Sequence, residues 1–354
     1  MKKIAKTMGK IVKWIMIAIV VVILLLFIVR AIGKAYYSRT PQGGINESMY
    51  VEINGTKQWI SIYGEDINNP VLLYLHGGPG MSTSSYDYAF TRQWADVYTV
   101  VTWDQRNCGK SYSPEQNNTE LTYELLMSDG AYMTKYILEY LEKDKLTLLG
   151  HSWGTYYGSN LVLEYPEYYE AYIGTGQLVD FDENEIALKE AASEWVGDDE
   201  EGLALLSQLN VDNYTGDYYA ARNNLMVKYG YDMFADGTDY SLSAAQYFNP
   251  YYSLSDFVNY INAEDTVYGK FLSSKEFNKF SLTGRYEYQV PYFNINGDKD
   301  YQTNYLIAQD YFDAIEAPNK KLYIMENTTH GLLESKSEEF SEILHEVAEI
   351  NNLK

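Results

Sequence analysis

The chain has 354 residues, of which 46% are hydrophobic, so it is long enough for one large or two modest globular domains with a substantial core. Its 49 acidic and 27 basic residues give a formal net charge of −22, which argues against nucleic acid as a partner because phosphate binding needs a positive surface. The single cysteine, Cys108, excludes an intramolecular disulfide and any metal site built from cysteines.

The first 40 residues differ from the rest of the chain. Five lysines within residues 1–13 precede an uncharged apolar run from Trp14 to Val29. Extended through Ile32, this run is about 28 Å long as a helix, close to the thickness of a bilayer core. It predicts a retained transmembrane helix, with a cleaved signal peptide as the alternative because small residues near Gly33 and Ala35 permit cleavage. Lysines before the run outnumber the basic residues just after it, so we expect a single-pass cell-membrane protein with a cytoplasmic N-terminus and the long C-terminal part outside, or a secreted protein after cleavage.

Residues 41–180 alternate between strand and helix patterns. Asn54-Gly55 joins two alternating stretches and predicts a β-hairpin. Apolar runs within residues 70–80, 97–106, 145–150 and 170–178 predict buried strands, and residues 124–143 and 153–165 have helical spacing. Strands that alternate with helices indicate an α/β fold with a mainly parallel sheet.

Residues 181–287 break this alternation. The segment is acidic and helical, and we expect it to form an inserted helical cap. The alternation resumes in residues 288–354 with a strand near 290–297, a helix over 304–315, a strand over 320–325 and an amphipathic helix over 337–350. The predicted fold is therefore a sheet flanked by helices, with a helical insertion and an N-terminal membrane helix.

The sequence Gly150-His151-Ser152-Trp153-Gly154 fits Gly-x-Ser-x-Gly. The two glycines permit a sharp turn from strand to helix, in which the serine hydroxyl is exposed. The N-terminal amides of the following helix point to the same place, which suits an oxyanion. Ser152 is therefore a candidate nucleophile.

Only four histidines are available as its base. His151 is expected to point away from Ser152 across the turn, His345 occupies a solvated position of the last helix, and His76 precedes the serine by a long stretch. His330 follows the strand over 320–325, and loops at the carboxyl ends of parallel strands meet at one edge of the sheet. His330 is thus the predicted base.

The acid that orients the imidazole is expected after the strand near 290–297. Asp298 and Asp300 both follow this strand. Asp300 lies further into the loop and can turn toward His330, so we favour it; Asp298 remains the alternative because it could serve the turn through backbone contacts. The chain order Ser, Asp, His is that of one known hydrolase fold.

His76-Gly77-Gly78-Pro79-Gly80 directly follows a predicted strand. Its glycines let the backbone approach a ligand closely. The amides of Gly78 and Trp153 could together form an oxyanion hole, although a tight loop without function explains the same residues.

Together, "HGGPG" at 76–80, "WDQRNCGKS" at 103–111, "GHSWGT" at 150–155 and "GDKD" at 297–300 resemble the α/β-hydrolase superfamily, and within it the proline iminopeptidase-like serine hydrolases. The resemblance covers about Met49 to Lys354. It implies Ser152 as nucleophile, Asp300 and His330 as its partners, Gly78 and Trp153 as the oxyanion hole, the insertion as a cap, and no metal or organic cofactor. The residues of these motifs expected to support the site are His76, Gly77, Pro79, Gly80, Asp104, Gln105, Arg106, Gly150 and Gly154.

The sequence departs from the family pattern in three ways. Asn107 stands where the family usually has glycine, although asparagine tolerates a left-handed backbone. Members of the family are usually soluble, whereas this chain begins with a predicted membrane helix. Their caps bind the amine of the substrate with carboxylates, and no acid of the predicted cap of this chain can be matched to that role. The acids concerned are Asp182, Glu183, Glu185, Glu190 and Glu194.

The predicted activity is hydrolysis of a small peptide or ester through an acyl-enzyme, most simply by an aminopeptidase of the proline iminopeptidase type. The alternatives are a carboxylesterase and a surface binding module without catalysis. An epoxide hydrolase or dehalogenase is disfavoured because those enzymes place an aspartate where Ser152 stands.

Overall fold

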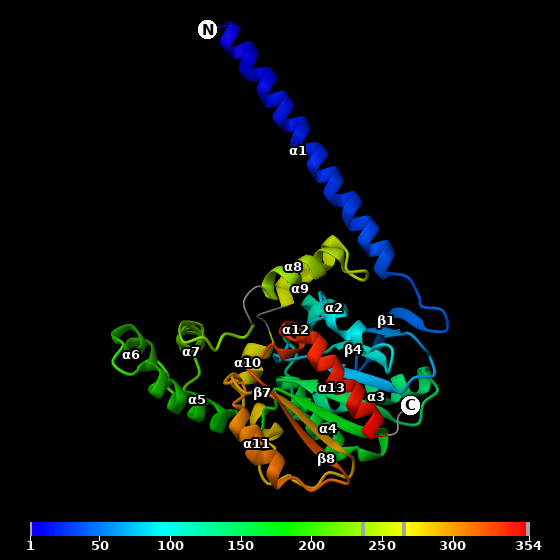
Figure 1. Ribbon diagram of the computed structural model, residues 1–354, viewed down its shortest axis with the longest axis vertical. Helices are drawn as coiled ribbons and strands as arrows, with labels where there is room; N and C mark the ends of the chain where they lie inside the picture. The colour runs from blue at the N-terminus through cyan, green and yellow to red at the C-terminus, as the bar shows by residue number, and fades with distance from the viewer. Residues whose placement is uncertain (1, 235–237, 264–266, 352–354) are drawn as a thin grey trace.

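The computed structural model describes residues 2–234, 238–263 and 267–351. Helix α1 (Lys2–Tyr37) projects from the remainder of the molecule and contacts it only near its C-terminal end (Figure 1). Residues Thr7–Tyr37 are long and apolar enough to cross a membrane, with a mean hydropathy of 3.3 over an 18-residue window. A signal sequence would meet the same criterion.

Eight strands form one sheet in the order β1-β2-β4-β3-β5-β6-β7-β8. Strands β3 to β8 run parallel to one another, whereas β2 pairs antiparallel with both β1 and β4. The strands are β1 (Ile45–Ile53), β2 (Thr56–Gly64), β3 (Val71–Leu75), β4 (Thr99–Asp104), β5 (Leu146–His151), β6 (Tyr169–Thr175), β7 (Tyr292–Gly297) and β8 (Lys320–Met325). The predicted mainly parallel α/β sheet is confirmed.

The hairpin between β1 and β2 turns at Asn54 and Gly55, as predicted. Their φ angles of 45° and 77° are both positive, as a two-residue hairpin turn of this kind requires. Asparagine and glycine are the residues that adopt this conformation at least cost.

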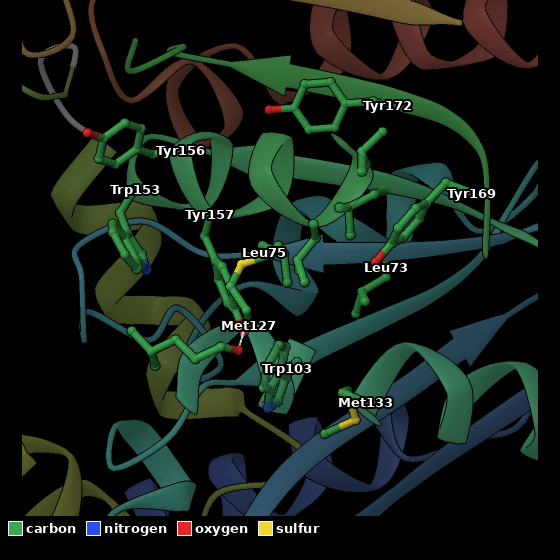
Figure 2. Close-up of a cluster of buried hydrophobic side chains, with 14 of the residues drawn as sticks. Leu73, Leu75, Trp103, Met127, Met133, Trp153, Tyr156, Tyr157, Tyr169 and Tyr172 are labelled. Carbon is green, nitrogen blue, oxygen red and sulfur yellow. Dashed lines mark hydrogen bonds between the residues drawn. The ribbon is translucent and has the colours of Figure 1, made fainter. Parts of the chain in front are cut away.

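Helices cover both faces of the sheet because alternate residues of its strands point to opposite sides. In β3, Leu73 and Leu75 join the hydrophobic cluster under α3, α4 and α11, while Leu72 and Tyr74 join the cluster under α2, α12 and α13. Figure 2 shows Trp153, Tyr156 and Tyr157 of α4 within the first cluster. These helices are α2 (Tyr88–Thr91), α3 (Tyr123–Tyr140), α4 (Trp153–Glu164), α11 (Tyr305–Ala314), α12 (Leu332–Ser335) and α13 (Ser337–Ile350).

The chain between β6 and β7 is helical, and these two strands nevertheless pair directly. Its helices are α5 (Phe181–Val196), α6 (Glu200–Leu206), α7 (Gly216–Lys228), α8 (Thr238–Phe248), α9 (Leu254–Ala263) and α10 (Tyr268–Leu272). Helices α5, α6 and α7 share a small hydrophobic core of their own, which includes Leu188 and Leu225. They extend away from the sheet, whereas α8 and α9 lie beside the end of α1 (Figure 1).

Short 3-10 helices complete the described structure. They are η1 (Arg92–Trp94), η2 (Gly109–Ser111), η3 (Pro114–Gln116), η4 (Pro166–Tyr168) and η5 (Phe277–Phe280).

Candidate active site

Four neighbouring parallel strands end at the same edge of the sheet and bring the candidate residues there. Ser152 follows β5, Gly176 follows β6, the Asp300 loop follows β7, and the His330 loop follows β8. Residues far apart along the chain therefore meet because their strands are adjacent.

The turn at Ser152 is sharp, and it has room only for glycine at positions 150 and 154. Ser152 has φ 55° and ψ −122°, a conformation that is unusual for a residue with a side chain. A Cβ atom at Gly150 would lie 2.3 Å from the Gly154 carbonyl oxygen, and one at Gly154 would lie 2.2 Å from that of Leu75. Both glycines are thus required for this strand-to-helix turn, which exposes the serine side chain at the start of α4.

Asp300 and His330 are paired. His330 Nδ1 lies 2.8 Å from Asp300 Oδ2, and both side chains are buried. Thr303 fixes the carboxylate, because its amide donates to Oδ1 at 3.0 Å and its hydroxyl to Oδ2 at 3.1 Å. Asp298 instead accepts a hydrogen bond from the Thr328 amide at 3.1 Å, so it holds the two loops together. The imidazole contact therefore falls on Asp300, the favoured member of the pair.

Ser152 and His330 lie at the same edge, but the Ser152 hydroxyl makes no hydrogen bond within the described part of the chain. Nδ1 of His330 is occupied by Asp300, which leaves Nε2 for a proton transfer. Such contacts are often loose in structures without substrate and tighten when substrate binds.

The "HGGPG" loop packs against the serine. A Cβ atom at Gly77 would lie 3.1 Å from that of Ser152, so this close approach depends on glycine. Gly78 has φ 120°, is exposed and lines the same cavity as Ser152. Gly80 lies against the ring of Tyr268 in α10, which leaves no room for a side chain, and Pro79 between them is buried.

His76 and Gln105 connect this loop to the first residue of α4. His76 Nε2 accepts from the Gln105 amide at 3.3 Å, and the Gln105 side chain accepts a 3.0 Å hydrogen bond from Trp153 Nε1. Burial lowers the pKa of His76 to about 4, so this imidazole is neutral. Gln105 therefore links the "HGGPG" loop to the start of α4 through hydrogen bonds to His76 and Trp153.

Asp104 and Arg106 tie together the segments around the site. Asp104 accepts hydrogen bonds from Ser82, from Ser84 at 2.8 Å and from the Lys110 amide at 2.6 Å. Burial raises the pKa of its carboxyl group to about 6.

Arg106 forms a buried bidentate ion pair with Asp129 of α3, with distances of 2.6 and 2.9 Å. Asn107 next to it has φ 53°, so asparagine does adopt the left-handed conformation expected at this glycine position.

The predicted orientation of His151 is wrong. Its ring is buried, lines the cavity together with Ser152, and packs on His330 with ring centroids 4.7 Å apart. Burial, followed by the nearby His330, holds the pKa of His151 well below its usual range. His151 is therefore a neutral neighbour of the candidate base. His345 lies away from the site on α13, 2.8 Å from Asp96.

A cavity of about 370 Å³ opens at Ser152. Its floor includes Gly78 and His151. Further lining comes from Met81, Ser82, Thr83, Tyr86 and Glu334 of the core and from the segment between β6 and β7. The residues of that segment that line it are Met233, Phe234, Leu242, Ser243, Gln246 and Tyr260. These six described residues carry no charged group, so this part of the helical segment covers the site without contributing a carboxylate.

Among the described residues that line the cavity, one carboxylate is present, and it comes from the core. Glu334 of α12 lines the cavity, and its Oε2 atom is shielded from solvent with no hydrogen-bond partner in the described structure. Burial raises the pKa of Glu334 to about 7. A ligand that brings a positive charge to this atom would satisfy it.

Glu185 is the buried acid of α5, but it is already neutralised. Arg222 of α7 contacts it at 2.8 Å, and the Tyr218 hydroxyl donates to it at 2.6 Å. The other cap acids named from the sequence, Asp182, Glu183, Glu190 and Glu194, lie outside the cavity lining.

Sequence reasoning missed Gly176 and Glu334. At Gly176, with φ 56°, a Cβ atom would lie 2.9 Å from His330 Cε1 and 3.2 Å from Asp300 Oδ2. The available signals were a glycine near the end of a predicted strand and an acid within four residues of the candidate base. Neither signal is specific without the strand order.

A family model described as alpha/beta hydrolase fold matches residues 70–337, a range that contains every strand from β3 to β8. The chain belongs to the alpha/beta hydrolase fold family. The hydrolase is 27% identical over 295 residues to "Probable aminopeptidase YbaC" of Bacillus subtilis (strain 168), which covers 79% of this chain and 89% of that protein. It is 31% identical over 100 residues to proline iminopeptidase of Lactobacillus helveticus, covering 28% of this chain and 33% of that relative.

Solved structures show the same fold. A proline iminopeptidase-related protein from Thermus thermophilus aligns with a TM-score of 0.60 at 20% identity, covering 86% of this hydrolase and 97% of that chain. Proline iminopeptidase of Mycobacterium smegmatis also has a TM-score of 0.60 at 20% identity, covering 87% and 99%. The prediction of an enzyme of the α/β-hydrolase class, similar to proline iminopeptidases, is confirmed.

Proposed function

We propose that this hydrolase is a membrane-anchored serine aminopeptidase that releases an N-terminal residue through an acyl-enzyme on Ser152. The observation that carries the proposal is the buried 2.8 Å contact between His330 and Asp300, at the edge where Ser152 opens into the cavity. A nucleophile, a base and an acid that orients the base are the groups that this chemistry needs.

In the proposed reaction, Ser152 Oγ attacks the carbonyl carbon while His330 Nε2 accepts the hydroxyl proton. Asp300 accepts the hydrogen bond from Nδ1–H and offsets the charge of the imidazolium. The amides of Gly78 and Trp153 donate to the tetrahedral oxyanion. His330 then protonates the leaving amine, the C–N bond breaks, and an acyl ester remains on Ser152.

Water completes the cycle. His330 takes a proton from a water molecule as its oxygen attacks the acyl ester, and returns that proton to Ser152 Oγ as the ester bond breaks. The released acid is the N-terminal amino acid of the substrate.

Glu334 supports a substrate with a free amine over a simple ester. Its unpartnered carboxylate oxygen lines the same cavity as Ser152, and an ammonium group there would complete a charge-assisted hydrogen bond. The names of the relatives, aminopeptidase and proline iminopeptidase, point to the same class of substrate. The carboxylesterase alternative has no use for this charge.

The anchor assignment rests on α1. Its apolar segment reaches Tyr37, and lysines are concentrated before it. With a cytoplasmic N-terminus, the catalytic domain lies outside the cell. Protease added to intact cells should then digest the catalytic domain, and complete protection of that domain would place it inside.

The nucleophile is tested with Ser152→Ala. We expect hydrolysis of prolyl and alanyl amides to fall by about a million-fold and labelling by a fluorophosphonate probe to disappear. Hydrolysis at the native rate by this variant would refute the proposed function, and a native chain that resists the probe would favour a binding module.

The substrate class is tested by comparing each amide with its N-acetylated form and with short acyl esters. Loss of turnover on acetylation supports an aminopeptidase. Faster turnover of esters, unchanged by acetylation, would identify a carboxylesterase.

A further inference from the structure

The last turns of α1 are fixed to the segment between β6 and β7. Arg30, although it belongs to an otherwise exposed helix, is only 7% exposed. Its guanidinium donates to the carbonyl oxygens of Tyr247 and of Tyr252, the latter at 3.0 Å, and Lys34 donates to the Tyr252 carbonyl at 2.7 Å. The connection between α8 and α9 therefore has a defined position relative to α1.

The last residues of α8 also reach the part of α1 expected to lie within lipid. The Tyr247 hydroxyl donates to the carbonyl oxygen of Leu26, which is inside the uncharged run from Trp14 to Val29. Leu26 is one helical turn, about 6 Å, from Arg30 along the axis. Phe248 packs on Gly33, where a Cβ atom would lie 2.2 Å from its ring.

The surface of residues 247–258, here called the α8–α9 corner, differs from the rest of this acidic chain. No charged residue occurs between Tyr240 and Ser255. Asp256 is paired with Lys110 at 3.0 Å. Leu254 and Val258, one turn apart on α9, are 59% and 58% exposed.

We propose that the α8–α9 corner lies in the interfacial region of the bilayer that holds α1 and makes a second membrane contact through Leu254 and Val258. The inference rests on the anchor of the proposed function and adds a surface to it. An apolar helix face at an interface typically enters the bilayer by about 5–10 Å. The corner reaches Leu26, which lies about 6 Å further along α1 into the apolar run than Arg30, so its position agrees with such a depth. Tyrosines such as Tyr247 are enriched at this level because their rings are apolar and their hydroxyls are polar.

The contact has a consequence for the active site. Leu242, Ser243 and Gln246 of α8, together with Tyr260 of α9, line the cavity at Ser152. Asn249 in the connection donates at 2.8 Å to the carbonyl oxygens of Ser84 and Ser85, next to cavity residues of the core. The roof of the cavity is therefore the membrane-facing element, and substrate is taken up beside the lipid surface.

Lipid quenching tests the proposal on the full chain. Single cysteines replace Leu254, Val258, Leu24 of α1 and Leu203 of α6, and each is labelled with bimane. Leu203 is the matched control because it is an exposed leucine, at 47%, on the other half of the helical segment. Cys108 is buried, so the native chain measures background labelling. Each protein is reconstituted in phosphatidylcholine vesicles with and without bromine on the acyl chains.

We expect brominated lipid to reduce emission at positions 24, 254 and 258 and to leave position 203 unchanged. Quenching at 24 with unchanged emission at 254 and 258 would overturn the second contact and leave the anchor intact. Unchanged emission at 24 as well would overturn both.

Discussion

The two halves of the helical segment between β6 and β7 differ in charge and in role. Helices α5 to α7 are rich in acids, have their own hydrophobic core and extend away from the sheet (Figure 1). Helices α8 and α9 are nearly uncharged, line the cavity at Ser152 and contact the end of α1. The acidic half is thus the more conspicuous in sequence and the more remote from the proposed chemistry.

This difference shows that an acidic cap does not by itself indicate recognition of a substrate amine. In the acidic half, Glu185 is paired with Arg222, and Asp199 with Lys228 at 3.0 Å. In the part of the chain that the structure describes, the carboxylate that lines the cavity without a hydrogen-bond partner, Glu334, comes from α12 of the core. The predictions below separate acids that stabilise the fold from the acid that faces the cavity.

Among the variants that test this comparison, the largest effect is expected for Glu185→Ala. Removing one partner of a buried ion pair leaves Arg222 uncompensated, so the free energy of unfolding of α5 to α7 should fall by about 3–5 kcal/mol. Hydrogen exchange of these helices measures the change, with Glu183→Ala on the exposed face of α5 as the control. The ratio of turnover for free and acetylated amides should stay unchanged. A collapse of that ratio would mean that Glu185, and not Glu334, binds the amine.

Gly176→Ala should lower activity by displacing His330, and a matched control shows how much of the loss comes from backbone strain at a positive φ. The new Cβ atom would meet His330 at 2.9 Å, and a displacement of this kind can reduce kcat/KM by about 100-fold. Gly197→Ala is the matched control, because Gly197 has a similar φ of 51° but no atom within 4 Å of the added carbon. Equal activity of the two variants would show that Gly176 does not position His330.

Glu334→Gln should reduce kcat/KM for free-amine amides by about 10- to 100-fold and leave acyl esters unaffected, because a charge-assisted hydrogen bond contributes about 1.5–3 kcal/mol. The pKa of Glu334 is raised to about 7, so its negative charge is lost as the pH falls below that value.

The ratio of kcat/KM for a free-amine amide to that for an ester cancels every pH dependence that the two reactions share. This ratio should decline as the pH falls through about 7 in the native enzyme and stay flat in the variant. A ratio that is flat in the native enzyme would remove Glu334 from substrate binding.

The smallest effect is expected for Arg30→Ala. This variant loses the hydrogen bonds to the Tyr247 and Tyr252 carbonyl oxygens, which should remove roughly 1.4 kcal/mol of stabilisation from the α8–α9 corner. Amide hydrogen exchange in the corner should therefore become about 10-fold faster. Lys13→Ala, at the other end of the apolar run, serves as the control. Equal exchange in both variants would show that α1 does not hold the corner.

Local sequence signals predicted much of the fold and the candidate site. Asn54-Gly55 predicted its hairpin because few residues accept two positive φ angles in succession. Gly150 and Gly154 predicted the turn at Ser152 because no larger residue fits there. His330 was selected because the other histidines lacked a suitable place, and the structure pairs it with Asp300. The error at His151 arose because the direction of a side chain beside a strained turn depends on its neighbours in space.

The sequence by itself determined the elements, the turn chemistry and the strand ends at which Ser152, Asp300 and His330 occur. These features depend on short-range sterics and hydrophobic periodicity, which neighbouring residues carry. Only the tertiary structure decided that Glu185 is neutralised, that Glu334 is not, and that Arg30 meets Tyr247 across 217 residues of chain. Whether a charge is available to a substrate depends on which opposite charges the fold places beside it, and that information is spread over the whole chain.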